Sequence, residues 1–132
     1  MKENTLIVDH KSRLPFNETV DLLISEASKN EWNVPAVHDL QQSLAKSGKM
    51  VRPVNVIEIC KPEYSGQMLE LNDERIISVM MPCRISVYEK NDGFAYIGLI
   101  NAGEMAAGLT ATIARVMKAA SDETLEIVKT VS

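Results

Sequence analysis

The feature that most constrains the fold is a pair of strand-like segments joined by a short turn in "MPCRISVYEKNDGFAYIGLI". Apolar and polar residues alternate over residues 83–89, and a second apolar run covers residues 94–100. Between them, "KNDGF" carries Asp-Gly at its centre, the typical sequence of a tight hairpin turn. Because the two strands of a hairpin are antiparallel, this segment predicts a sheet that is rich in antiparallel pairs.

The rest of the chain supplies further strands and helices. Short β-branched or apolar runs predict strands at 5–10, 31–39 and 54–60. Apolar residues at helical spacing predict an amphipathic helix over 18–30, with Asn17 as its N-cap, and a short helix at 40–48 that Gly48 ends. Pro62 favours a helical turn after it, followed by an extended return to residue 82. Asn101 is expected to cap a long helix with Met105, Leu109, Ile113 and Val116 on its apolar stripe, and Ser121 marks a break or a fresh helix start.

Two prolines and two cysteines affect the strand predictions. Pro35 places the strand at 31–39 on a sheet edge or gives it a bulge, because proline cannot donate to a ladder. Cys83 shares its alternation with Ile85 and Val87, which favours a buried thiol. In "VNVIEIC" the alternation is ambiguous, so the direction of Cys60 cannot be read.

This order of elements predicts an α+β protein with two layers. One antiparallel-rich sheet of about five strands carries two long helices on one face, and residues 1–132 are treated as a single domain. The other face of the sheet would need cover, which favours a homodimer.

Composition excludes several classes of protein. The 132 residues carry a formal net charge of −4, which is unlike the basic surface of a nucleic-acid-binding protein. Apolar runs are far too short for a membrane span. The N-terminus lacks the apolar core of a signal peptide, so we expect a cytoplasmic protein whose cysteines are reduced.

The candidate site consists of Cys60 and Cys83, in a chain with seven methionines. Thiolate and thioether sulfurs suit soft metals or haem iron, although both residue types are also common core residues. Each cysteine lies at a strand end beside a proline, so we expect the two to meet at one end of the sheet. Three interpretations stay open: core packing, a soft-metal or haem site at Cys60 and Cys83, and a disulfide.

Other titratable residues are less informative. His10 and His38 each follow or precede an aspartate, but neighbouring strand residues face opposite sides, which disfavours a catalytic dyad. Glu123 and Glu126 are interpreted as solvated charges near a helix start. No catalytic residue and no cofactor can be assigned from these patterns.

Several segments together resemble the domain-of-unknown-function 302 family over about residues 5–120. They are the helix-start pattern in "FNETVDLLISEASKNEWNVPAVHD", the Cys-x-Pro of "VIEICKPEYSGQML", and "MPCRISVYEKNDGFAYIGLIN". The resemblance implies a two-layer α+β fold similar to the TATA-binding-protein type, usually dimeric, and it implies no established activity. Lys61 departs from the family pattern, where an Asn-Pro turn is common.

Three functions follow as hypotheses. The first is a small homodimeric domain that binds a small molecule or soft metal in the cleft between sheet and helices. The second is a thiol-based enzyme or sulfur carrier, which needs a cysteine of lowered pKa. The third is a protein-interaction module without a bound ligand.

Overall fold

A computed structural model describes residues 6–105 and 108–132 and shows an α+β fold. The elements run in this order: β1 (Ile7–Lys11), α1 (Phe16–Lys29), β2 (Asn33–Asp39), α2 (Leu40–Ala45), β3 (Val54–Cys60), α3 (Pro62–Leu69), η1 (Asn72–Met80), β4 (Cys83–Glu89), β5 (Ala95–Ile100), α4 (Ala102–Met105) and α5 (Ala111–Lys129). Among these residues, none of the helices is long and apolar enough to cross a membrane.

The five strands form one antiparallel sheet in the order β1-β5-β4-β3-β2. The central hairpin is confirmed, because β4 pairs with β5 and Gly93 in the turn takes a φ of 83°. That left-handed backbone favours glycine, which has no Cβ to clash. The prediction for Pro35 is also confirmed: β2 is an edge strand, and its pairing register shifts between Asn33 and Ala36.

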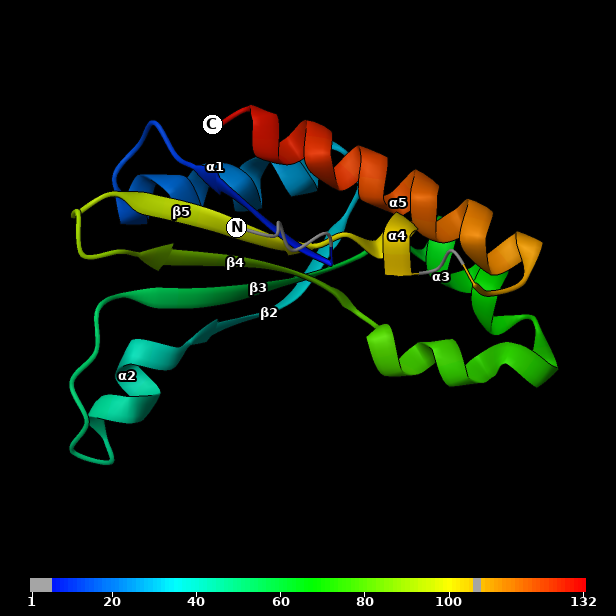
Figure 1. The fold of residues 1–132 in the computed structure, drawn as a ribbon, viewed down its shortest axis with the longest axis horizontal. Coiled ribbons are helices and arrows are strands. Elements are labelled where there is room, and N and C mark those ends of the chain that lie inside the picture. Colours follow the sequence, from blue (N-terminus) through cyan, green and yellow to red (C-terminus); the bar gives the residue numbers. More distant parts are fainter. Residues whose placement is uncertain (1–5, 106–107) are drawn as a thin grey trace.

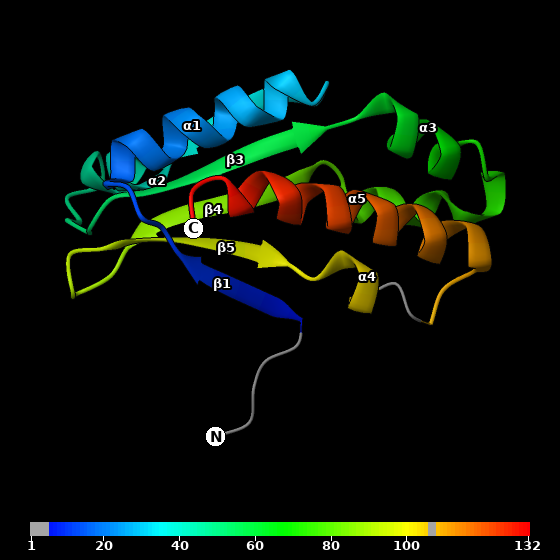
Figure 2. The ribbon, with the colours of Figure 1, turned by 90° about the horizontal axis from the view of Figure 1, so that it is seen from above.

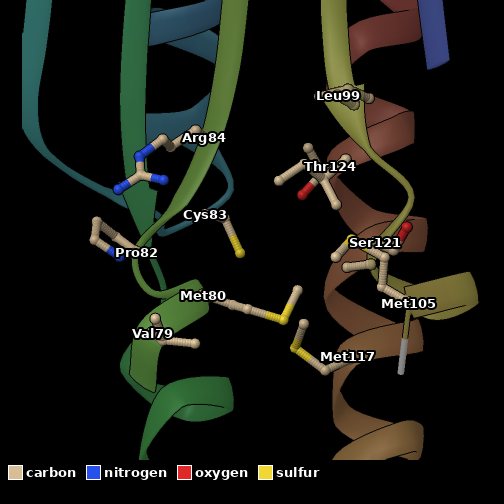
Figure 3. Close-up of a pocket in the computed structure, with 12 residues that line it drawn as sticks. Val79, Met80, Pro82, Cys83, Arg84, Leu99, Met105, Met117, Ser121 and Thr124 are labelled. Atoms are coloured by element: carbon tan, nitrogen blue, oxygen red, sulfur yellow. The ribbon is translucent and has the colours of Figure 1, made fainter. Parts of the chain in front are cut away.

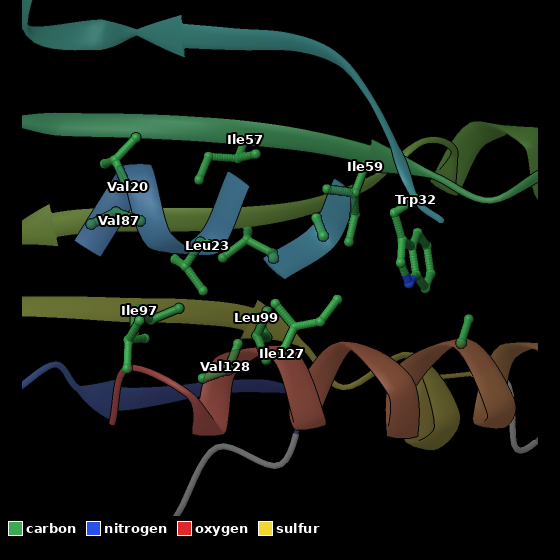
Figure 4. Close-up of a cluster of buried hydrophobic side chains, with 14 residues drawn as sticks. Val20, Leu23, Trp32, Ile57, Ile59, Val87, Ile97, Leu99, Ile127 and Val128 are labelled. Atoms are coloured by element: carbon green, nitrogen blue, oxygen red, sulfur yellow. The ribbon is translucent and has the colours of Figure 1, made fainter. Parts of the chain in front are cut away.

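The two long helices, α1 and α5, lie on the same face of the sheet, as predicted (Figure 1). Seen from above, α5 extends beyond the ends of β4 and β5 and reaches α3 and α4 (Figure 2). The main core forms between the sheet and these helices, and Leu23, Ile57 and Ile97 are fully buried in it (Figure 4). A second apolar cluster lies under the part of α5 that overhangs the sheet; its buried members are Met68, Ile77, Ile113, Val116 and Met117.

Helix boundaries differ from prediction at three places. α1 begins at Phe16 with Pro15 as its N-cap, so Asn17 is not the cap. Residues 72–80 form the 3₁₀ helix η1 where an extended return was expected. Asn101 caps a helix, since its side-chain oxygen accepts from the Glu104 N–H at 3.2 Å, but that helix is the short α4.

The long C-terminal helix starts only at Ala111 and runs unbroken through Ser121 to Lys129. Met105 and Leu109 are therefore exposed and do not belong to its buried stripe, whereas Ile113 and Val116 do. The cap signal at Ser121 is overridden because the acidic residues after it find partners within the helical conformation. Asp122 pairs with Lys118 one turn earlier, and Glu123 accepts hydrogen bonds from outside the helix. Tertiary contacts of this kind routinely outweigh local propensity.

Candidate functional site

A cleft lies at the end of the sheet, between β4 and α5 (Figure 3). Its volume is about 140 Å³, and its wall comes from η1, β4, β5, α4 and α5. A smaller cavity of about 30 Å³ lies next to it, between β3, α3 and α5. Four residues line both spaces: Met80, Pro82, Cys83 and Met117.

Sulfur atoms dominate the shared wall. Met80 ends η1, Cys83 begins β4, and Met117 lies in the first half of α5. Figure 3 shows the sulfur atoms of these three side chains directed into the space between β4 and α5. We call these three residues the sulfur cluster. Met105 also lines the cleft, so four of its twelve lining residues contain sulfur.

Cys83 occupies the position that its alternation predicted, on the helix-covered face with Ile85 and Val87. Its thiol is free, and burial raises its pKa above the ordinary value for cysteine, with a smaller contribution from Cys60. Burial acts in this direction because an apolar surrounding disfavours the charged thiolate. At neutral pH, Cys83 is therefore a protonated thiol that points into the cleft.

Cys60 is not the ladder partner of Cys83. In the sheet, Cys83 lies opposite Ile59, and Ile59 faces the core. Cys60 is the next residue, so it belongs to the opposite alternation of β3. Its sulfur lies 3.8 Å from the Ser65 hydroxyl of α3, and its thiol is also free. Both cysteines border the smaller cavity.

The residues around the cleft limit which metal or cofactor could bind there. Within residues 6–105 and 108–132, no group of three or more His, Cys, Asp or Glu side chains is placed to hold a metal. A cleft of about 140 Å³ matches the size of cavity that takes up one benzene molecule, which is much smaller than the volume of a haem macrocycle. A metal at this site would have to use methionine sulfurs as well.

A partly buried polar network adjoins the smaller cavity, and the sequence did not predict it. The Glu123 carboxylate on α5 accepts from the Trp32 indole N–H at 3.0 Å, and also from Lys61 and from the Tyr64 hydroxyl. The side chain of Lys61 is only 11% exposed. Lys61 also lies over the Tyr64 ring, 5.7 Å from its centroid.

The network changes the acidity of its members. Burial acts to raise the pKa of Glu123, but the hydrogen bonds from Lys61 and Tyr64 outweigh burial and lower it. The same contact raises the pKa of Tyr64 to about 12, because the Glu123 carboxylate stabilises the protonated phenol. The interpretation of Glu123 as a solvated charge is therefore wrong, whereas Glu126 is 72% exposed and pairs only with Lys129. The one feature of the sequence that could have indicated this network is Lys61, a charged residue inside the Cys-x-Pro turn.

The histidines lie elsewhere. His38 is on the edge strand β2, where it contacts Glu58 at 2.9 Å, and its side chain is half exposed. His10 is on β1, the opposite edge strand. The aspartate beside His10 is engaged by Tyr88 and Lys90, so it does not orient the imidazole.

Fold and site together define a two-layer α+β domain with a sulfur-lined cleft at the end of its sheet. The sequence matches the family described as "Domain of unknown function DUF302" over residues 8–131. The chain belongs to this family.

Two relatives extend the comparison. An uncharacterised protein of Aquifex aeolicus (strain VF5) is 26% identical over 107 residues, which is 81% of this chain and 67% of that protein. The crystal structure of an uncharacterised conserved DUF302 protein from Bacillus stearothermophilus superposes with a TM-score of 0.88, covering 98% of this chain and all of that one, at 16% identity. The likeness to this crystal structure shows that the two chains share a fold.

Proposed function

We propose that this protein binds a small ligand in the cleft between β4 and α5. The observation that carries the proposal is the convergence of apolar and sulfur-containing side chains on one cavity, with the Cys83 thiol directed into it (Figure 3). Small-molecule sites are concave and mostly apolar, with a few polar groups in the wall. A cleft of about 140 Å³ at the end of the sheet, lined mostly by apolar side chains, has this character.

The volume and lining limit the ligand. A space of this size takes a molecule of about the bulk of benzene, or a single ion with its protein ligands. Charged side chains are scarce in the wall, where Arg84 is the one formal charge among the twelve lining residues. The site therefore favours a small, weakly polar or soft ligand over a charged metabolite.

The thiol-enzyme hypothesis is less well supported. A nucleophilic cysteine needs a lowered pKa, whereas burial raises the pKa of Cys83. The interaction-module hypothesis has one supporting feature, a groove beside η1 with exposed Ile76, Val79 and Leu109 on its wall. An interaction module does not account for the cleft between β4 and α5, whereas ligand binding does. We therefore prefer the ligand-binding hypothesis.

Methyl NMR with benzene as the probe tests the proposal. Protein labelled at the methionine methyl groups is titrated with benzene, and the Met80 and Met117 signals should shift while exposed Met50 stays unchanged. Ser121→Leu fills the cleft and should abolish the shifts. Unchanged Met80 and Met117 signals at saturating benzene, or shifts that persist in Ser121→Leu, would refute an accessible cleft.

We further propose that the protein is a homodimer. Within the described residues, the two long helices cover one face of the sheet, and the other face carries no long helix (Figure 1). Exposed apolar residues such as Ile7 and Ile100 lie at the β1–β5 side of the sheet. Light scattering at micromolar concentration should give twice the 14.6 kDa chain mass, and a monomer mass would contradict the proposal.

A further inference from the structure

We infer that the sulfur cluster of Met80, Cys83 and Met117 is a binding site for copper(I). This inference rests on the proposed function, because it names the ligand of the same cleft. It differs from the Cys60–Cys83 pair expected from the sequence, since it uses one thiol and two thioethers.

Three separate elements bring these sulfur atoms together. Met80 is the last residue of η1, and Cys83 follows across Met81 and Pro82 as the first residue of β4. Met117 reaches the same space from α5, where it is 4% exposed. All three residues line both the cleft and the smaller cavity, and Figure 3 shows their side chains directed into the space between β4 and α5. Three sulfur-containing side chains from η1, β4 and α5 therefore border the same space.

Ligand chemistry selects the ion. Thiolate and thioether sulfurs are soft ligands that favour copper(I), whereas zinc prefers cysteine, histidine and carboxylate in fourfold sets. The described residues hold no group of three His, Cys, Asp or Glu that would suit zinc. Thioethers carry no charge and bind hard cations poorly, so calcium and magnesium are also disfavoured.

Charge balance points the same way. When copper(I) binds, the Cys83 S–H loses its proton to solvent and the S–Cu bond forms, with no change of oxidation state. The resulting thiolate and monovalent cation sum to zero, so the apolar cleft takes up no net charge. A divalent ion on the same ligands would leave one uncompensated positive charge in that surrounding.

Neighbouring charges do not supply a competing ligand. Arg84 lines the cleft, and Lys61 lines the smaller cavity, where Glu123 pairs with it. Cys60 borders the smaller cavity but does not line the cleft. The Thr124 hydroxyl donates to the Ala120 carbonyl at 2.8 Å, which occupies its hydrogen. Binding should therefore release one proton per ion and strengthen as pH rises.

The test is an anaerobic titration of the whole chain with copper(I) against a coloured copper(I) chelator. We expect one ion per chain, about a hundredfold weaker binding in Cys83→Ser, and about tenfold weaker binding in Met80→Leu and in Met117→Leu. Leucine conserves most of the methionine volume, so these two variants should stay folded. Matched controls are Cys60→Ser and Met50→Leu, which should bind within about twofold of the wild type because neither residue lines the cleft.

Three outcomes overturn the inference. Wild-type protein that does not compete with the chelator has no site. Equal losses in Cys60→Ser and Cys83→Ser would assign the ion to the cysteine pair. Unchanged affinity in both methionine variants would remove the thioethers from the site. If benzene still shifts the Met80 and Met117 methyl signals while copper(I) fails to bind, the cleft remains a ligand site and only the identity of the ligand is wrong.

Discussion

The two apolar clusters of this protein are built from different side chains. The main core between sheet and helices consists chiefly of branched aliphatic residues, and Leu23, Ile57 and Ile85 in it are completely buried. The second cluster, beneath the overhanging part of α5, contains Met68 and Met117 together with Ile77, Ile113 and Val116. The cleft and the groove beside η1 both border this second cluster.

The contrast separates a region that defines the fold from a region that is able to adapt. Branched side chains have few rotamers and pack to a unique arrangement, whereas methionine is unbranched and fills irregular spaces. Enclosed space also lies beside the methionines. We therefore place the candidate function at the end of the molecule that contains α3, η1, α4 and the start of α5.

The largest expected effect is a difference in stability between equivalent truncations in the two clusters. Leu23→Ala should lower the free energy of unfolding by about 4 kcal/mol, and Ile113→Ala by about 2 kcal/mol, within the usual range for buried truncations. The difference arises because Ile113 borders a groove of about 350 Å³, where neighbours are able to relax. Urea unfolding at unchanged m-value measures both. Equal losses would show that the second cluster is packed as tightly as the first.

The polar network between the clusters should give the next largest effect. Glu123→Gln leaves the nearly buried Lys61 ammonium without its carboxylate, which should cost about 2 kcal/mol after allowance for partial exposure of Glu123. The control is Glu126→Gln on the same helix, whose exposed pair with Lys129 should contribute less than about 0.5 kcal/mol. Thermal or urea unfolding measures the loss of stability in each of the two variants. Similar small losses in both variants would mean that Lys61 finds another partner or solvent.

The same network predicts the pH dependence of stability. The folded-state pKa of Glu123 is lowered, so its contribution is present above the pKa of an unfolded glutamate and is lost as pH falls through the folded value. The folded-state pKa of Tyr64 is raised from 10.0 to about 12, so its contribution is complete below pH 10.0 and is lost as pH rises toward about 12. In Glu123→Gln both dependences should shrink, and an unaltered pH profile would contradict this account.

The smallest expected effect concerns thiol reactivity at the cleft. In Cys60→Ser, the remaining thiol is Cys83, and a disulfide reagent at neutral pH should modify it at least about tenfold more slowly than in denatured protein. The cause is its raised pKa and its position inside the cleft. Equal modification rates in native and denatured protein would show that the cleft opens freely. The second cluster would then differ from the main core in its mobility.

Local patterns were sufficient for much of the sheet. The Asp92-Gly93 turn, the edge position of Pro35 and the inward face of Cys83 each depend on a few neighbouring residues, and each prediction is confirmed. The extended return after α3 and the break at Ser121 are wrong. In both segments, contacts with distant parts of the chain decide the backbone conformation, as Met80 packing against the second cluster and Glu123 bonding to Trp32 illustrate.

By itself, the sequence determined the antiparallel sheet, its two-layer class and the two long helices on one face, because alternation and helical spacing follow from which side chains must leave water. Only the tertiary structure decided the site. Met80, Cys83 and Met117 line one cleft because η1, β4 and α5 converge at the end of the sheet, and Glu123 reaches Tyr64 and Trp32 across 59 and 91 positions. Such long-range contacts depend on how α5 lies across the sheet, which cannot be predicted from local sequence patterns. The pairing register decided the relation of the cysteines for the same reason: Cys83 lies opposite Ile59, so Cys60 is one residue beyond its ladder partner.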